Sequence, residues 1–281
     1  MSRPNHGITP ANMPPNPARP NFNAAIFDMD GVVTQTAVVH AAAWKKMFDE
    51  YLHRRAEREH EAFREFTQAA DYLVYVDGRP RYQGVQVFLQ SRGIQIPYGS
   101  PADPPQAETI CGLGNRKNEF FNRTLAEDGV QVYDSTLRLI RELRARGIAV
   151  GIATSSRNCV PILEQAGIAD LFATRVDGMV SLALGLKGKP EPDIFTTACR
   201  NLGAQPQRAI VIEDAVAGIQ AGVKGHFALV IGVAREGNEE ALQTAGADLV
   251  VSDLSAVTLD QIDHLAGKLL RNQTATGAPA D

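Results

Sequence analysis

The sequence predicts an α/β protein with a doubly wound parallel-sheet core and an inserted, mainly α-helical cap. After Gly129, short apolar runs rich in Val, Ile and Ala alternate with helical segments, which is typical of parallel strands covered by helices on both faces. A further apolar run, Ala24–Phe27, stands near the start of the chain and is separated from the others by a long helical stretch. We therefore expect the first strand to belong to the same sheet, with the helical stretch as an insertion.

The first predicted strand ends abruptly in an acidic loop. The apolar residues Ala24–Phe27 are followed directly by Asp28-Met29-Asp30-Gly31. A short apolar run bounded by a polar, Gly-containing loop is typical of a buried strand and the turn that ends it. We expect this loop at the carboxyl edge of the sheet, where doubly wound folds bind their ligands.

The insertion is predicted to be helical but interrupted. Apolar residues recur at helical spacing from Ala37 to about Ala70, which predicts helix over this whole stretch. The residues that share its apolar side are Val39, Ala43, Met47 and Tyr51, and further on Phe63 and Phe66. Arg79–Pro80 and the stretch Pro97–Pro105 break the pattern, and Asn115–Leu125 resumes a charged helix before Gly129.

The second half of the chain alternates between strands and helices. Helices are expected at residues 136–146, 160–166 and 215–221, and strands at 148–153, 209–212, 228–232 and 248–251. The predicted core therefore comprises residues 21–37 and 130–270, and the predicted cap comprises residues 38–129. Residues 1–20 are rich in proline and are expected to form a disordered tail, and residues 271–281 a second flexible tail.

Composition excludes several classes of protein. The 281 residues include 28 Lys and Arg against 32 Asp and Glu, a formal net charge of −4, whereas nucleic-acid-binding proteins typically present a strongly basic face. No apolar run approaches the roughly 18 residues that cross a membrane. Cys111, Cys159 and Cys199 are odd in number and lack C-x-x-C spacing, so neither a disulfide framework nor a zinc site is expected. We expect a cytoplasmic protein, monomeric or weakly homo-oligomeric, without nucleic-acid or membrane partners.

Four polar clusters are spaced along the predicted core, three of them directly after a strand. They are Asp28-Met29-Asp30-Gly31, Thr154-Ser155-Ser156-Arg157-Asn158, Lys189-Pro190 and Glu213-Asp214. Each alone has a structural explanation, such as a turn, a helix N-cap or a charge that complements a helix dipole. Because the carboxyl ends of parallel strands share one edge, the clusters can converge, and we interpret the set as a functional site.

The acidic members of these clusters indicate a cation site. The carboxylates of Asp28, Glu213 and Asp214 would repel one another strongly at one edge of the sheet unless a cation lay among them. An all-oxygen donor set suits Mg²⁺. The sequence therefore predicts a magnesium site.

The remaining members of the clusters can bind and transfer a phosphate. Lys189, the Thr154 hydroxyl and the N–H groups at the helix start after Ser155 would supply positive charge and hydrogen-bond donors. One carboxylate can then attack phosphorus, while a second, Asp30, protonates the leaving oxygen and later deprotonates an incoming one. This arrangement predicts phosphoryl transfer.

These motifs resemble those of the haloacid dehalogenase-like (HAD) phosphotransferases, and the resemblance extends from Asn21 to about Leu270. Within that superfamily the β-phosphoglucomutase group is the most similar, because the first motif continues Gly31-Val32-Val33-Thr34-Gln35-Thr36-Ala37, followed by His40 and Ala43-Trp44-Lys45. The group is also matched by the cap sequence Arg116-Lys117-Asn118 and by Ser156-Arg157-Asn158. The resemblance implies a Rossmann-like core with a mobile cap.

The resemblance also implies a role for each matched residue. Asp28 would become the aspartyl phosphate, and Asp30 would act as general acid and base. The Mg²⁺ ligands would be Asp28, the backbone carbonyl of Asp30 and Asp214, with Glu213 beside them. The transferring phosphate would bind Thr154 and Lys189, and the far end of a sugar phosphate would bind Ser156, Arg157, Asn158, Arg81 and Lys117. Thr36 would be a hinge residue that restrains Asp30 until the cap closes, and His40 would help to sense the substrate.

Two features of the cap depart from the β-phosphoglucomutase group. An acid, Asp77, stands before Gly78 where the group has lysine, and the stretch Pro97–Pro105 makes the cap longer. The segment from Val76 to Leu89 resembles relatives regarded as hydrolases, some of them linked with trehalose metabolism. These departures bear on the substrate rather than on the phosphoryl chemistry.

The leading hypothesis is a Mg²⁺-dependent sugar phosphomutase that interconverts a hexose 1-phosphate and a hexose 6-phosphate through phospho-Asp28. The alternative is a sugar-phosphate phosphatase, acting for example on trehalose 6-phosphate or a hexose phosphate, in which water attacks the same intermediate. A tenfold preference for sugar over water corresponds to only about 1.4 kcal/mol, so the sequence leaves both open. A non-catalytic binding module is disfavoured because every expected catalytic position is present.

Overall fold

The computed structural model describes residues 20–235 and 237–276, and at its centre is a six-stranded parallel sheet. The strands are β1 (Ala24–Phe27), β2 (Ala149–Ala153), β3 (Thr174–Val176), β4 (Ala209–Glu213), β5 (Leu229–Val233) and β6 (Leu249–Val251), in the order β3-β2-β1-β4-β5-β6. Ala24 pairs with both Ala149 and Ala209, so the first strand lies in the middle of the sheet. The predicted fold class is confirmed, and the acidic loop after β1 is placed at the centre of the carboxyl edge.

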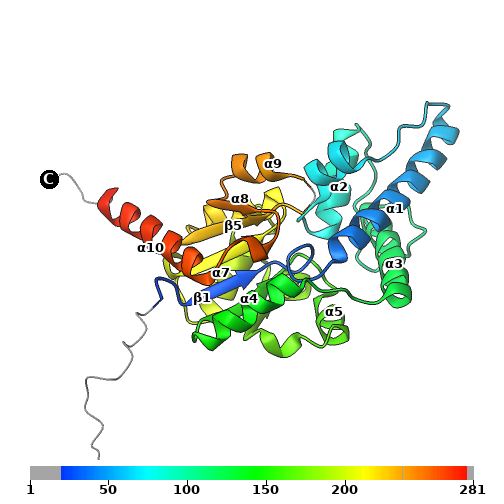
Figure 1. Ribbon diagram of the computed structural model, residues 1–281. Helices are drawn as coiled ribbons and strands as arrows, with labels where there is room; N and C mark the ends of the chain where they lie inside the picture. Colours follow the sequence, from blue (N-terminus) through cyan, green and yellow to red (C-terminus); the bar gives the residue numbers. More distant parts are fainter. Residues whose placement is uncertain (1–19, 236, 277–281) are drawn as a thin grey trace, which may run out of the picture.

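Helices cover both faces of the sheet, as Figure 1 shows. One face packs against α4 (Asp134–Ala145), α5 (Cys159–Gln165) and α10 (Leu259–Thr276), and the other against α7 (Asp193–Asn201), α8 (Val216–Lys224) and α9 (Glu239–Thr244). Side chains alternate between the two cores, since Ala25 and Phe27 belong to the first and Ala24 and Ile26 to the second. The shorter elements are α6 (Gly178–Leu184) and the 3₁₀ turns Ala169–Leu171, Pro206–Arg208 and Leu254–Ala256.

The inserted segment forms a layer of its own beyond the carboxyl edge of the sheet (Figure 1). It consists of α1 (Thr36–Glu59), the π-helix η2 (Gln68–Val76), α2 (Arg81–Ser91) and α3 (Ile110–Asp128). These elements enclose a separate hydrophobic core in which Phe48 stacks on Phe66, with ring centroids 4.8 Å apart, and contacts Phe88 at 4.2 Å. The cap thus has an apolar core of its own, while Ala43 of α1 and Phe121 and Leu125 of α3 join the first core of the sheet.

The prediction of one helix from residue 37 to about 70 is wrong beyond Glu59. His60 takes a left-handed conformation (φ 57°) and ends α1, and the chain then turns back along the helix. Lys45 donates a hydrogen bond to the carbonyl of Phe66, whose own N–H donates to Asp49. Phe63 stacks on His53 at 3.5 Å. The apolar side chains that imitate a continued helical face are therefore packed against α1 across space.

The predicted elements of the core all form, with strand ends within one residue of their predicted positions. The short edge strand β3 and the helices α6, α7, α9 and α10 have no counterpart in the sequence predictions. Of the expected tail at residues 271–281, the described part to Thr276 continues the helix α10, which packs on the sheet further upstream through Ile262 and Ala266. The expected tail at residues 1–20 lies, except for Pro20, outside the described residues. In the described ranges no helix is long and apolar enough to cross a membrane.

Candidate active site

A cleft lies between the cap and the carboxyl edge of the sheet, and most of the predicted site residues line it. Those that line it are Asp28, Asp30, His40, Arg81, Lys117, Thr154, Ser155, Ser156, Arg157, Asn158, Glu213 and Asp214. The two others, Thr36 and Lys189, stand directly behind the lining, in contact with Asp30 and Asp28 respectively. The convergence expected from strand topology is therefore present in the fold.

Asp28 occupies the first position after β1 and is almost completely buried. Its N–H donates to the carbonyl of Ile212, 2.9 Å away, so the ladder with β4 continues through the carboxylate-bearing residue. The Lys189 ammonium lies 2.5 Å from the Asp28 carboxylate and also bonds Glu213. Burial, reinforced by Glu213, holds the pKa of Asp28 well above its usual range even with Lys189 beside it. Burial disfavours the ammonium, yet Asp28 and Glu213 raise the pKa of Lys189, which stays charged.

Asp28, Glu213 and Asp214 can hold a metal ion among them. One carboxylate oxygen from each lies within 4.8 Å of the others. Glu213 is fixed by the N–H groups of Asp214 and Ala215, which both donate to its Oε2 over 2.7 Å. Burial and then the charge of Glu213 raise the pKa of Asp214, as expected when carboxylates crowd together without a cation. A buried, all-carboxylate donor set of this kind fits a hard divalent cation.

The Asp30 carboxylate contacts two residues one turn apart at the start of α1. The Thr36 hydroxyl donates to its Oδ1, and the Thr34 hydroxyl lies 2.6 Å from that of Thr36. Nε2 of His40 lies 3.2 Å from the same oxygen. Burial opposes ionisation, but His40 and Thr36 together keep the pKa of Asp30 below its ordinary value. The Thr154 hydroxyl is 3.4 Å from the other oxygen.

A lysine of α3 completes this arrangement. The Lys117 ammonium contacts Nδ1 of His40 and lies over the rings of Trp44 and Phe121, 5.0 and 4.9 Å from their centroids. Burial and the nearby Arg81 hold the pKa of Lys117 well below its usual range. Burial and Lys117 likewise lower the pKa of His40. His40 thus lies between Lys117 of the cap and Asp30 of the core and contacts both.

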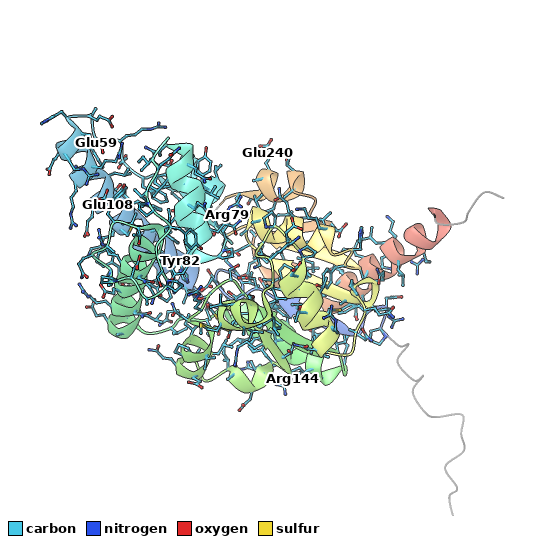
Figure 2. The ribbon with its side chains drawn as sticks, turned by 180° about the vertical axis from the view of Figure 1, so that it is seen from behind. Glu59, Arg79, Tyr82, Glu108, Arg144 and Glu240 are labelled. Carbon is cyan, nitrogen blue, oxygen red and sulfur yellow. The ribbon has the colours of Figure 1, made fainter. Side chains whose placement is uncertain are left out.

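The far end of the cleft is built from cationic and amide side chains. Asn118 of the cap accepts hydrogen bonds from Arg81 (2.7 Å) and from Asn158 of the core (2.9 Å). Arg157 lies over the ring of Tyr82, 4.8 Å from its centroid, and Figure 2 shows Tyr82 on the side of the cap that faces the core. Burial lowers the pKa of Arg81 to about 10, so its guanidinium remains charged at neutral pH. This end of the cleft suits a second anionic group.

Two groups of residues in or beside the cleft were not predicted as site residues. Asp77 and Tyr72 line it, and the Asp77 N–H donates to the carbonyl of Tyr72 over 2.9 Å. Burial, followed by the charge of Glu213, raises the pKa of Asp77 to about 7. Arg235 and Asn238 line a smaller adjoining cavity behind Asp214. Both residues follow β5. The expectation that functional residues lie at the carboxyl ends of parallel strands therefore applies to them as well.

Comparison with known proteins establishes the family. A model of the haloacid dehalogenase-like hydrolases matches residues 22–226. The chain belongs to this family. A HAD-family protein of Mycobacterium bovis named "Beta-phosphoglucomutase" is 47% identical over 235 residues, which cover 83% of this chain and 90% of that protein. The M. leprae "Trehalose-phosphate phosphatase" is 35% identical over 140 residues, 48% of this chain and 31% of that one.

Solved structures of the HAD family share the fold. The structure of "beta-Phosphoglucomutase" from Clostridium difficile superimposes with a TM-score of 0.70 at 24% identity, over 89% of this chain and 99% of that one. The resemblance to HAD enzymes of the β-phosphoglucomutase type is therefore confirmed, and so is the prediction of an enzyme that catalyses phosphoryl transfer. The alternative of a non-catalytic binding module is accordingly set aside.

Proposed function

We propose that the chain is a Mg²⁺-dependent sugar phosphomutase that interconverts hexose 1-phosphate and hexose 6-phosphate. The observation that carries this proposal is the position of Asp30, whose carboxylate contacts two residues one turn apart at the start of the inserted segment, Thr36 and His40 of α1. A general acid and base that depends on a cap residue is fully assembled only when the cap is over the substrate. Such coupling favours transfer to a sugar, which fills the cleft, over transfer to water.

The cleft has an anion site at each end, which suits a substrate that carries two phosphates in turn. Near Asp28, the buried Lys189 and the Thr154 hydroxyl supply a cation and a donor for the transferring phosphoryl group. At the far end, Arg81, Arg157 and Asn158 supply charge and donors for a second phosphate. A mutase needs both sites, because the sugar must be held by one phosphate while the other is transferred.

The chain's own residues can carry each step. An Asp28 oxygen would attack phosphorus and form the aspartyl phosphate, while Asp30 gives the departing sugar oxygen the proton that it took from a sugar hydroxyl in the preceding half-reaction. In the reverse direction Asp30 would take the proton of a sugar hydroxyl as that oxygen attacks phospho-Asp28, and Lys189 would balance the charge on the phosphoryl group. Mg²⁺ held by Asp28, the Asp30 carbonyl and Asp214, with Glu213 beside them, would neutralise charge on the phosphate oxygens. Asp77 would accept hydrogen bonds from sugar hydroxyls.

The product balance tests this proposal. Incubated with β-glucose 1-phosphate, catalytic bisphosphate and Mg²⁺, the enzyme is expected to form glucose 6-phosphate with little free phosphate. EDTA should abolish the reaction, and Asp28→Asn should reduce it by at least about 10³-fold, because the nucleophile is lost. Free phosphate as the main product would instead establish a phosphatase. Activity retained by Asp28→Asn would contradict the covalent mechanism itself.

The phosphatase alternative is supported by the partial likeness to the M. leprae trehalose-phosphate phosphatase. It uses the same groups around Asp28 and differs only in the acceptor of the phosphoryl group. Trehalose 6-phosphate therefore belongs in the same assay as β-glucose 1-phosphate. Release of phosphate from trehalose 6-phosphate faster than isomerisation of the hexose phosphate would favour this alternative.

A further inference from the structure

The loop that follows β5 contacts the backbone of both acidic loops of the site. Nε of Arg235 donates to the carbonyl of Gly31 over 3.0 Å, and the side-chain amide of Asn238 donates to the carbonyl of Asp214 over 3.0 Å. Neither residue lines the catalytic cleft, and neither contacts a reacting atom. Two side chains of one short loop thus reach the two segments that carry Asp30 and Asp214.

Gly31 and Asp214 touch where these two segments meet. Gly31 has a φ of 85°, and a Cβ atom at this position would lie 1.7 Å from Oδ2 of Asp214. The Asp214 carboxylate therefore rests directly against the Gly31 backbone. A displacement of Gly31 by a few tenths of an ångström would displace the carboxylate as well, because close-packed groups cannot move independently.

Arg235 is itself rigidly held. Its Nη1 donates to Asp253 over 2.6 Å, and Asp253 also accepts a hydrogen bond from the Ser135 hydroxyl. The guanidinium lies 3.5 Å from the centroid of the Tyr133 ring, and only 13% of the side chain is exposed. These contacts fix the Arg235 side chain against α4 and the turn after β6. Its guanidinium therefore loses little further conformational entropy when it bonds the Gly31 carbonyl.

We propose that Arg235 and Asn238 are positioning residues that set the spacing between the Asp28–Gly31 loop and Asp214, and thereby the affinity for the divalent cation. The proposal rests on the cation site of the proposed function. Hydrogen bonds that orient metal ligands from outside the coordination sphere typically change metal affinity or activity by about 10- to 100-fold when removed. Arg235 acts through the Gly31 backbone and Asn238 through the Asp214 backbone, so each variant should affect binding of the metal before binding of the sugar.

The test is the Mg²⁺ dependence of thermal stability in the full-length chain. A ligand that binds only the folded state stabilises it by RT ln(1 + [L]/Kd), so the melting temperature begins to rise once the ligand concentration exceeds the dissociation constant. For Arg235→Met and for Asn238→Ala, we expect the Mg²⁺ concentration that gives a fixed rise in melting temperature over the metal-free variant to increase at least about tenfold relative to wild type. The Mg²⁺ requirement of Arg235→Lys should lie between those of these variants and the wild type. An ammonium keeps the charge but cannot bond Gly31 and Asp253 in the fork geometry of a guanidinium. The apparent KM for Mg²⁺ should rise in parallel, with little change in the KM for the sugar phosphate.

Matched control variants separate positioning from general destabilisation. Arg146→Met removes an exposed arginine that pairs with Asp260, and Asn201→Ala removes an exposed amide that bonds Thr174, both away from the cleft. Neither should change the Mg²⁺ concentration needed for that fixed rise in melting temperature. Lower melting temperatures of the metal-free Arg235 and Asn238 variants with an unchanged Mg²⁺ requirement would overturn the proposal and leave a purely structural role. A wild-type protein without any Mg²⁺-dependent stabilisation would overturn the cation site as well.

Discussion

The Nε2 atom of His40 lies 3.2 Å from Oδ1 of Asp30, so a cap helix supplies a direct partner to the carboxylate of the core. Lys117 contacts the opposite ring nitrogen, Nδ1. Burial and Lys117 lower the pKa of His40. The pKa of Asp30 therefore depends on a residue of the cap.

Replacement of His40 should weaken catalysis rather than folding. In His40→Ala the Asp30 carboxylate loses the imidazole that lies 3.2 Å away and helps to hold the pKa of Asp30 below its ordinary value. We expect kcat/KM for the sugar phosphate to fall roughly 10- to 100-fold. His53→Ala, which alters the stacked His53–Phe63 pair of the same helix, is the matched control and should remain within about twofold of wild type. A His40→Ala enzyme as active as that control would refute the role of this contact.

Removal of the Thr36 hydroxyl should change the pH dependence of the reaction. The hydroxyl helps to lower the pKa of Asp30, so its loss in Thr36→Val raises that pKa. A raised pKa keeps Asp30 protonated to higher pH, and the limb of the kcat/KM profile that reports Asp30 should move upward in pH. Thr197→Val, at a buried threonine of α7, serves as the control. Coincident profiles for Thr36→Val and wild type would show that this hydroxyl does not tune the acid.

Lys189 is expected to be important for stability as well as for catalysis. Lys189→Met would leave Asp28 and Glu213 buried without their cation, which typically costs about 3–5 kcal/mol. Lys224→Met removes a half-exposed ion pair with Glu191 and should cost at most about 1 kcal/mol. Urea unfolding of the two variants in EDTA measures the difference. Equal losses would mean that the buried charges are neutralised in another way.

Asp77 should make the metal-free protein less stable as the pH rises. Its folded-state pKa of about 7 lies above the unfolded value near 4, so between these pH values the native state keeps a proton that the unfolded state releases. Stability is therefore lost as the pH rises through this window, to which the raised pKa values of Asp28 and Asp214 also contribute. Asp77→Asn should remove the contribution of Asp77 to this pH dependence. The free energy of unfolding of the variant, relative to that of wild type, should therefore increase by up to about 4 kcal/mol from pH 4 to pH 8.

Urea unfolding in EDTA at several pH values measures this gain. Asp170→Asn, at an exposed aspartate, is the control and should show a stability difference that does not depend on pH in this range. A constant difference for Asp77→Asn across the same range would contradict the raised pKa.

The core of the fold was predictable because its rules are local and repetitive. Short Val/Ile/Ala runs such as 209–212 can hardly be anything other than buried parallel strands, and the structure has a strand there from Ala209 to Glu213. The three-residue strand β3 could not be found in this way, since Thr174–Val176 is too short and too mixed to show a period. The end of α1 at Glu59 was missed because Phe63 and Phe66 repeat at helical spacing yet pack on α1 from a separate segment.

The sequence is sufficient to predict that Asp28, Thr154 and Asp214 meet, because parallel topology brings the ends of strands to one edge whatever the loops between them do. Contacts between cap and core depend instead on how two separately packed units meet. The partnership of His40 with Asp30, the place of Asp77 beside Glu213 and the hold of Arg235 on Gly31 follow from tertiary packing alone. The pKa shifts follow from it too, since burial is a property of the folded chain and not of any motif.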